Sequence, residues 1–291
     1  MHRFVLHNDE IRECGDKLLA AGQVGLLTGW GVFSTIRVAS GVLFAFERHW
    51  ARMKRDAALV CVPFPTDVEH MRSRLLSLVK ANRAENATLR VVVVRNRDGT
   101  WEGPTSRDFD LIALTADLTD WGSGVRLAVE PNARFAASPY TGAKIISWAP
   151  NLASLETAQA AGFDEVLLLN ERGEASECAS ANVFASEGSE VFTPPLDSGC
   201  LPGVTRELLL GEVRAEGITV REKALRLEDL ERADEVFITS TTRDLLPVVS
   251  IEGLKIRRQG GARQRLLAAF RSYLEAYVAA HRHPAPPEGR N

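Results

Sequence analysis

Tyr140-Thr-Gly-Ala-Lys144-Ile-Ile-Ser-Trp148 is a stretch of small and apolar residues that contains a single charge, the ammonium of Lys144. Each of the other five lysines has a charged residue within three positions, as solvated lysines usually do. An ammonium in apolar surroundings must be paired, lose its proton or be used chemically. Desolvation makes a lysine a nucleophile that can form Schiff bases. The stretch therefore indicates a reactive lysine, and the alternative is a lysine that extends along apolar surface to reach water.

The composition of the 291-residue chain excludes several classes of protein. Apolar residues make up 45% of it and charged residues 25%, which is typical of a globular protein. The net charge of −3, with both signs interspersed, argues against nucleic acid or an anionic membrane as a partner. No apolar run approaches the roughly 20 residues that cross a bilayer, and the first residues lack the apolar core of a signal peptide.

The cysteines and histidines show no spacing that is typical of ligands. Cys14, Cys61, Cys178 and Cys200 lie far apart without a CxxC pair, which indicates free thiols in a reducing compartment. No two histidines have the spacing of metal ligands. We therefore expect a cytoplasmic protein without a metal site.

A small N-terminal domain is predicted over residues 1–118. Residues 23–46 alternate glycines with β-branched and aromatic residues around the turn Ala39-Ser-Gly41, which predicts a hairpin. The elements predicted after it are helices at 47–60 and 67–82 and strands at 89–95 and 109–116. The polar, glycine-bearing stretch 117–124 contains the expected interdomain linker, residues 119–124.

A larger C-terminal domain is predicted over residues 125–280. Its expected strands are 125–130, 165–169, 180–185, 190–193 and 234–239, and its expected helices are 152–161, 205–216 and 261–279. Strands outnumber helices and strict βαβ alternation is missing, so the predicted fold class is α+β rather than doubly wound. Residues 281–291 are expected to form a disordered tail, because their composition cannot support a packed core.

Two turns rich in hydroxyl and amide groups are candidates for binding a phosphate. Gly199-Cys-Leu-Pro-Gly-Val-Thr-Arg206 precedes a predicted helix whose first amides, with Thr205 near the cap, form a ready anion site. Ser240-Thr241-Thr242 follows a predicted strand and offers similar donors. An ordinary helix cap is the alternative for each turn taken alone.

Charged residues near two other strands are further candidates. Glu177 lies among small residues just before a strand, where a carboxylate can approach a flat ring closely. A surface carboxylate in a turn is the alternative. Arg95 and Arg97 flank a predicted strand end and suit a carboxylate ligand, with solvated arginines as the alternative.

The order of these motifs carries a resemblance that none of them carries alone. The segments concerned are Gly29-Trp-Gly-Val-Phe-Ser-Thr-Ile-Arg37, Glu47-Arg-His-Trp-Ala-Arg52-Met53, Ala143-Lys144, Gly162-Phe-Asp-Glu-Val-Leu-Leu-Leu169, Ser176-Glu177, Asn182-Val-Phe184, Thr193-Pro-Pro195, Leu201-Pro-Gly-Val-Thr-Arg206 and Ala233-Asp-Glu-Val-Phe-Ile-Thr-Ser-Thr241. Together they resemble the class IV pyridoxal-phosphate aminotransferases, over about residues 20–250. This family includes branched-chain aminotransferases, D-amino acid aminotransferases and aminodeoxychorismate lyases.

The resemblance implies a two-domain fold type IV enzyme that binds pyridoxal 5'-phosphate and forms a homodimer. Lys144 resembles the lysine that binds the cofactor aldehyde. Glu177 resembles the acid that keeps the pyridine nitrogen protonated, so that the ring can accept electrons. Arg52 matches the arginine that binds the phosphate. The implied cofactor-binding residues are Arg52, Lys144, Glu177, Val204, Thr205, Ser240 and Thr241, and the implied substrate-binding residues are Phe33, Thr35, Arg95, Arg97 and Thr242.

The implied activity is transamination between an amino acid, with branched-chain amino acids among the candidates, and a 2-oxo acid, with Lys144 as the catalytic residue. The alternative is a 4-amino-4-deoxychorismate lyase, which releases pyruvate and 4-aminobenzoate through the same lysine. Thr35 falls where the lyase branch carries a threonine. Phe33 stands where the D-amino acid branch has a tyrosine, and Cys178 stands where many relatives have glycine. A catalytically dead homologue would require loss of Lys144 or Glu177, and both are present.

Overall fold

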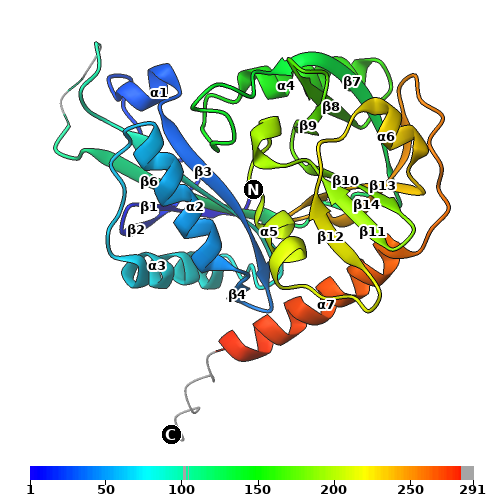
Figure 1. Cartoon of the computed structure of the whole chain (residues 1–291). Coiled ribbons are helices and arrows are strands. Elements are labelled where there is room, and N and C mark those ends of the chain that lie inside the picture. The colour runs from blue at the N-terminus through cyan, green and yellow to red at the C-terminus, as the bar shows by residue number, and fades with distance from the viewer. Residues whose placement is uncertain (101–102, 104, 283–291) are drawn as a thin grey trace, which may run out of the picture.

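The first of two β-sheets is built from strands that all precede residue 118. The computed structural model describes residues 1–100, 103 and 105–282, and Figure 1 shows the two sheets beside each other. The six strands of this sheet follow the order β2-β1-β6-β5-β3-β4, and all neighbours are antiparallel. Their bounds are Phe4–His7 (β1), Glu10–Glu13 (β2), Gly31–Ala39 (β3), Val42–Leu43 (β4), Ala87–Arg95 (β5) and Phe109–Asp117 (β6).

The hairpin predicted over residues 23–46 is confirmed in its turn and wrong in its first part. β3 and β4 pair antiparallel across Ser40 and Gly41, which adopt φ angles of 48° and 77°. Residues 24–28 form a short helix, α1 (Val24–Thr28), instead of a strand. Gly29, at φ 66°, ends this helix in the left-handed region that glycine tolerates, and the chain then enters β3.

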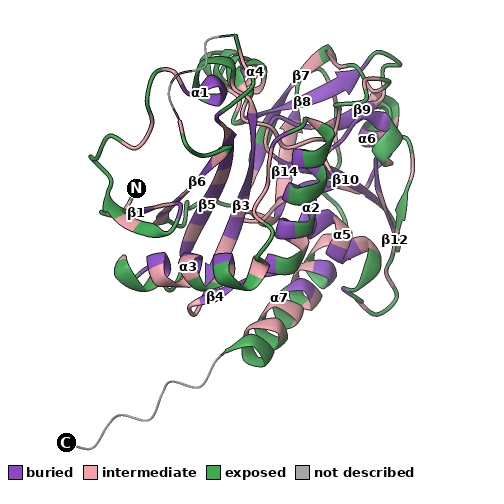
Figure 2. Ribbon diagram, turned by 90° about the vertical axis from the view of Figure 1, so that its left-hand side faces the viewer, coloured by how far each residue is buried: buried purple, intermediate pink, exposed green. Residues whose placement is uncertain are grey.

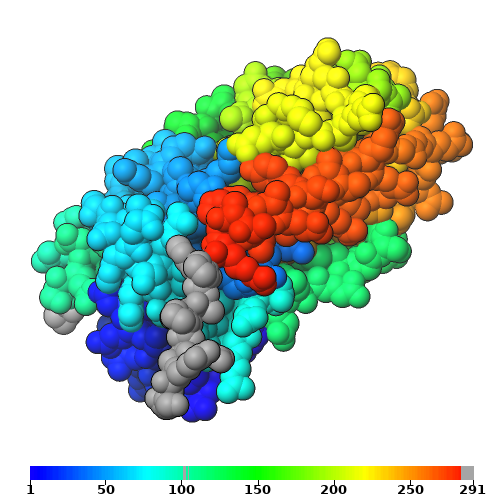
Figure 3. Space-filling view, turned by 90° about the horizontal axis from the view of Figure 1, so that it is seen from below, coloured from blue at the N-terminus to red at the C-terminus, as the bar shows by residue number. Residues whose placement is uncertain are grey.

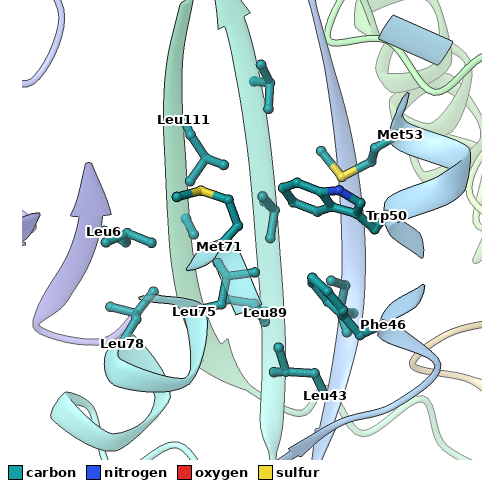
Figure 4. Packing of buried hydrophobic residues seen from close by; sticks show 14 of the residues in the cluster. Leu6, Leu43, Phe46, Trp50, Met53, Met71, Leu75, Leu78, Leu89 and Leu111 are labelled. Atoms are coloured by element: carbon teal, nitrogen blue, oxygen red, sulfur yellow. The ribbon is translucent and has the colours of Figure 1, made fainter. Parts of the chain in front are cut away.

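Helices α2 (Phe46–Leu59) and α3 (Val68–Ala81) cover one face of this sheet, and both predicted helices are thereby confirmed. The Asp67 side chain caps α3 by accepting from the His70 amide at 2.9 Å. Figure 4 shows how the two helices and the sheet enclose one apolar core. Its labelled members are Leu6, Leu43, Phe46, Trp50, Met53, Met71, Leu75, Leu78, Leu89 and Leu111.

The second sheet is built from strands that all follow residue 124. Its order is β12-β11-β10-β13-β14-β7-β8-β9. Three neighbouring pairs, β11–β12, β14–β7 and β7–β8, are parallel and the others are antiparallel, so the sheet is mixed, as the α+β prediction requires. The bounds are Val125–Arg134 (β7), Glu165–Asn170 (β8), Ala175–Cys178 (β9), Asn182–Glu187 (β10), Glu190–Thr193 (β11), Thr219–Glu222 (β12), Glu235–Ser240 (β13) and Asp244–Ile251 (β14).

The helices of the second half are short, apart from the last. They are α4 (Ala149–Ala160), a 3-10 turn η1 (Leu196–Ser198), α5 (Val204–Gly211), α6 (Leu227–Arg232) and α7 (Ala262–His281). The predicted helix over 205–216 ends early, because the amides of Glu212 and Val213 both bond to the Leu208 carbonyl and close the last turn. The disordered tail expected over residues 281–291 is wrong at its first residue, because His281 still belongs to α7. Residues 283–291, to which the rest of that prediction applies, lie outside the described part of the chain.

Four strands of the second sheet depart from the sequence-based prediction: β9, β12 and β14 were not predicted, and β10 begins later than expected. The strand expected at 180–185 begins at Asn182, because the Cys178 amide bonds to the Ala181 carbonyl at 2.7 Å and closes a turn there. β14 was not predicted at all. It contains Pro247, and proline usually marks a sheet edge, whereas β14 lies between β13 and β7. The domain boundaries at 118 and 124 stay a prediction.

Helix α7 lies across the surface where the two halves of the chain meet. The space-filling view of Figure 3 shows it in contact with both halves. Phe44, next to β4, packs edge-to-face against Phe270, Tyr273 and Tyr277 of α7, with ring centroids 5.2–6.3 Å apart. Figure 2 shows the buried residues on the strands and on the helix sides that face them. No helix within the described residues is long and apolar enough to span a membrane.

Candidate active site

The backbone of Lys144 is fixed to the first sheet, although Lys144 follows the first strand of the second sheet in sequence. β4 pairs only with the end of β3, so the start of β3 has a free edge. The segment 144–146 pairs with this edge. The Phe33 amide donates to the Lys144 carbonyl at 3.0 Å, and the Ile146 amide donates to the Gly31 carbonyl at 3.0 Å. The Lys144 amide donates in turn to the buried Asp56 carboxylate of α2, also at 3.0 Å.

The side-chain amine of Lys144 lies in largely apolar surroundings. Its Nζ atom is 4.4 Å from the ring centroid of Phe33 and 6.0 Å from that of Trp148. Burial lowers the pKa of Lys144 to about 7, with Arg52 and Arg90 acting in the same direction and the carboxylates of Glu177 and Asp56 opposing them. The residue keeps partial solvent exposure, so a ligand can reach it. Near neutral pH a large share of the amine is unprotonated and nucleophilic.

Glu177 lies on β9 with both carboxylate oxygens engaged. Arg134 donates to Oε1 at 3.3 Å, and the Leu201 amide donates to Oε2 at 3.0 Å. Burial raises the pKa of Glu177, while Arg134 and the Leu201 amide oppose that rise by stabilising the carboxylate. The side chain is 12% exposed. Sequence analysis identified Glu177 from its small neighbours but missed Arg134, which lies 43 residues earlier in a strand of mixed composition.

Arg52 is a buried cation without a carboxylate partner among the described residues. Its Nη2 donates to the Ser34 hydroxyl at 2.9 Å and its Nη1 to the Pro202 carbonyl at 3.3 Å, while Nε has no partner. Burial lowers the pKa of Arg52 to about 10. A guanidinium with neutral partners in a desolvated place is suited to an anionic ligand.

Further donors come from two turns predicted from the sequence. Val204 and Thr205 are the first residues of α5, whose cap residue Gly203 offers no side-chain acceptor to the helix amides. The Pro202 carbonyl links Arg52 to this turn. At the end of β13, the buried hydroxyls of Thr239 and Ser240 have no hydrogen-bond partner within the part of the chain that the structure describes. Unpartnered buried donors of this kind indicate a ligand site.

The predicted substrate residues fall into two groups. Phe33 and Thr35 lie on the face of β3 opposite the apolar core, and Phe33 is covered on one side by the guanidinium of Arg90 at 4.1 Å. Arg95 is five residues beyond Arg90 on β5, so it points to the opposite face. It donates to the Arg97 carbonyl, pairs with Asp98 at 2.5 Å and stacks on Trp30. Arg97 pairs with Asp108 at 3.1 Å.

Arg90 was missed in the sequence analysis. Thr35 and Arg90 are directly opposed in the β3–β5 register, and Arg90 acts electrostatically on Lys144. Its guanidinium makes no ion pair or hydrogen bond with the described residues. The available signal was a charge inside the apolar run Leu89-Arg-Val-Val-Val-Val94. The structure therefore brings Arg90, rather than Arg95 or Arg97, toward Lys144.

The sequence of the chain matches one known protein family over most of its length. Residues 31–251 match the family described as amino-transferase class IV. The chain belongs to the class IV aminotransferase family. Membership confirms the resemblance found in the sequence and identifies the chain as an enzyme of the aminotransferase class.

Two relatives within the class IV aminotransferases show the spread of activities around this chain. A Methanocaldococcus jannaschii protein assigned as a branched-chain-amino-acid aminotransferase is 30% identical over 239 residues, which are 81% of this chain and 83% of the relative. The D-alanine aminotransferase of Bacillus licheniformis is 28% identical over 263 residues, 87% of this chain and 89% of the relative.

Solved structures confirm the fold type IV architecture. The branched-chain amino acid aminotransferase of Escherichia coli superposes with a TM-score of 0.86 at 25% identity, over 94% of this chain and 95% of that one. A Legionella pneumophila protein assigned as a 4-amino-4-deoxychorismate lyase superposes with a TM-score of 0.81 at 23% identity, over 89% and 96% of the chains. At that identity the second likeness shows a shared fold only.

The turn before α5 leads to a prediction about stability. A Cβ atom at Gly203 would lie 2.1 Å from Oδ1 of Asn182, whose amide group holds the Leu201 carbonyl at 2.9 Å. Gly203→Ala should therefore force the turn away from Asn182, at a cost of roughly 1–3 kcal/mol, and lower the Tm by about 2–4 °C for each kcal/mol. Thermal unfolding followed by circular dichroism measures the shift.

Gly211→Ala is the matched control in the same helix. A Cβ there meets no heavy atom within 4 Å, and alanine favours helix over glycine, so its Tm should be unchanged or slightly higher. Equal Tm values for the two variants would show that the Gly203–Asn182 contact does not constrain the turn.

Proposed function

We propose that the chain is a pyridoxal-phosphate-dependent transaminase that moves an amino group between an amino acid and a 2-oxo acid. The observation that carries the proposal is the desolvated amine of Lys144, with its pKa near 7, on which both the guanidinium of Arg52 and the anchored carboxylate of Glu177 act electrostatically. Branched-chain amino acids are the first candidates for the donor, because the 30% identical relative carries that assignment.

The residues of the site fit the chemical groups of pyridoxal 5'-phosphate. A phosphate dianion would be held by Arg52, by the first amides of α5 at Val204 and Thr205, and by the hydroxyl turn that begins at Ser240 and Thr241. Supporting this fit, the Arg52 Nε and the Ser240 Oγ are buried and find no hydrogen-bond partner in residues 1–100, 103 and 105–282. The Glu177 carboxylate suits a protonated ring nitrogen. The Lys144 amine suits the aldehyde.

In the mechanism, the cofactor when bound supplies a ring that accepts the electron pair left at the substrate α-carbon. Lys144 would take the proton from that carbon on its Nζ and give it up on the cofactor side of the transferred nitrogen, not to the same carbon, because an amine with a pKa of about 7 is available in both protonation states near neutral pH. Arg134 and the Leu201 amide hold Glu177 in place. Phe33 and Trp148 pack edge-to-face at 6.1 Å beside Lys144 and limit the access of water to it.

The substrate carboxylate is assigned here to Arg90 rather than to Arg95. The guanidinium of Arg90 lies on Phe33 and has no anionic partner among the residues that the structure describes, so it can bind a carboxylate without first breaking an ion pair with them. Arg95 and Arg97 would each have to leave an aspartate, Asp98 or Asp108. Thr242 follows Ser240 and Thr241 and remains a candidate for the same substrate group.

Transamination is preferred to lyase activity. Both relatives that cover most of the chain at 28–30% identity are aminotransferases by name, whereas the lyase-like structure shares the fold only. A homodimer and a cytoplasmic location also belong to this proposal. A subunit interface would cover exposed apolar side chains of α1, of α4 and of the segment that precedes Lys144 in the sequence. These side chains are Leu26, Leu27, Phe135, Tyr140 and Leu152.

Borohydride reduction tests the role of Lys144. Reduction of the purified holoenzyme should attach the cofactor irreversibly to one peptide, the one that contains Lys144, and peptide mass spectrometry identifies it. Lys144→Ala should abolish the attachment while keeping some reversible cofactor binding through Arg52 and α5. Attachment at another of the six lysines would contradict the assignment.

A substrate panel tests the activity itself. The purified enzyme, mixed with 2-oxoglutarate and single L- or D-amino acids, should form glutamate with branched-chain amino acids among the best donors. Aminodeoxychorismate should release no 4-aminobenzoate above the rate without enzyme. Chromatographic product analysis reads both reactions, and 4-aminobenzoate without any transamination would establish the lyase instead.

Paired alanine variants test which arginine binds the carboxylate. Arg90→Ala should raise the KM for amino acids about 10- to 100-fold, because a hydrogen-bonded charge pair contributes roughly 1.5–3 kcal/mol. Its effect on a simple amine without a carboxylate should be small. Arg95→Ala is the matched control on the opposite face of β5 and should leave both KM values within about twofold. A selective loss in Arg95→Ala alone would move the assignment back to Arg95.

A further inference from the structure

Asp56 is a buried carboxylate that contacts the backbone of Lys144. It lies on α2, one turn after Arg52, and its side chain is 1% exposed. Its Oδ2 accepts from the Lys144 amide at 3.0 Å. Its Oδ1 accepts from the neighbouring Arg55, whose Nη2 also donates to the Gly142 carbonyl at 3.4 Å. The pair Arg55–Asp56 therefore holds the segment 142–144 at two points.

The position of Asp56 also matters for the balance of buried charge. The cations around the site are Lys144, Arg52 and Arg90. The described carboxylates that act on Lys144 are Glu177 and Asp56. Each also has an arginine partner, Arg134 for Glu177 and Arg55 for Asp56. Asp56 also acts on Arg52. Among the charges that raise the pKa of Arg52, and so favour its charged form, Asp56 has the largest effect. Without Asp56 only one carboxylate would act on Lys144, so Asp56 reduces the cost of burying the charges of Lys144 and Arg52.

We propose that Asp56 is a positioning residue for Lys144: its carboxylate fixes the lysine backbone to α2 and supplies the second negative charge of the active site. The inference rests on the proposed role of Lys144 and adds a residue to it. This role could not be predicted from the sequence, because Asp56 follows Lys54 and Arg55 in a charged run that is typical of an exposed helix face.

Removal of the charge has a defined direction. The Asp56 carboxylate favours the ammonium form and so raises the pKa of Lys144, against the larger effect of burial. Without that charge, with Arg52, Arg90 and Glu177 unchanged, the pKa of Lys144 falls further. The unprotonated amine of Lys144 is then present at lower pH than in the wild-type protein. A variant that lacks the charge but keeps an acceptor separates this effect from the hold on the backbone.

The test uses the full chain freed of cofactor, because the free amine can then be titrated by its reaction with acetic anhydride. The acetylation rate of the Lys144 peptide, followed by mass spectrometry from pH 5 to 9, gives the midpoint of its titration. Asp56→Asn keeps an acceptor for the Lys144 amide and loses the charge. Its midpoint should lie at lower pH than that of wild type, with roughly threefold or faster acetylation at pH 6.

Asp110→Asn is the matched control. Asp110 is also a buried carboxylate of the first half of the chain, but it bonds to Asn8 and Asn96 and has no contact with Lys144. It should leave the acetylation profile unchanged even where it lowers the Tm. Asp56→Ser, which also keeps an acceptor without a charge, replaces Asp56→Asn if that variant does not fold by circular dichroism. An unchanged profile in the folded, uncharged variant overturns the proposal.

Hydrogen exchange tests the hold on the backbone. The amide of Lys144 should be protected in wild type and in Asp56→Asn, and should exchange at least about tenfold faster in Asp56→Ala, which has no acceptor. Equal protection in all three overturns the positioning role. These readouts need no turnover, so a failure of the proposed activity, shown by cofactor attachment at another lysine, is distinguishable from a failure of the link between Asp56 and Lys144.

Discussion

The pairing of residues 144–146 with the free edge of β3 is the interaction on which the site depends. Lys144 follows β7, a strand of the second sheet, yet its amide and carbonyl are both bonded to the first half, through Asp56 and Phe33. The amine is thereby held in a place where burial keeps its pKa near 7. β4 has two residues and pairs only with the end of β3, so the edge of β3 beside Gly31–Phe33 stays open. A longer β4 would occupy the edge to which residues 144–146 bind.

Alternation along β3 and β5 separates the side chains of the core from those on the opposite face, where the proposed substrate residues lie. Val32, Ile36 and Val38 point into the core beneath α2 and α3, while Phe33, Thr35 and Arg37 point to the other face. On β5 the same rule places Arg90 with the second group. Arg37 of that group pairs with Asp244 at 2.5 Å, directly after the hydroxyl turn of the second sheet. One face of the first sheet thus builds a core, and the other meets the second half of the chain.

Sequence patterns predicted those parts of the fold and of the site that depend on residues close together in the chain. Helical periodicity located α2 and α3, and a lysine without charged neighbours pointed to Lys144. Residues that act through tertiary contacts left no such pattern. Arg134 reaches Glu177 across 43 residues, and Asp56 reaches Lys144 across 88. β14 was missed because Pro247 normally argues against an internal strand, and α1 because glycines near residue 25 read as part of a hairpin.

The buried cations Arg52 and Lys144 have no carboxylate directly bonded to their side chains among the described residues, so their charges are balanced by carboxylates that act over a longer distance. Among the described residues Arg52 donates only to neutral acceptors, Ser34 Oγ and the Pro202 carbonyl, so no ion pair with them matches its charge. Lys144 can relieve the mismatch by losing its proton, which a guanidinium cannot do at neutral pH. An arginine and a lysine in one buried cluster therefore divide the roles. The arginine keeps a permanent charge for an anionic ligand, and the lysine becomes the group whose proton can move.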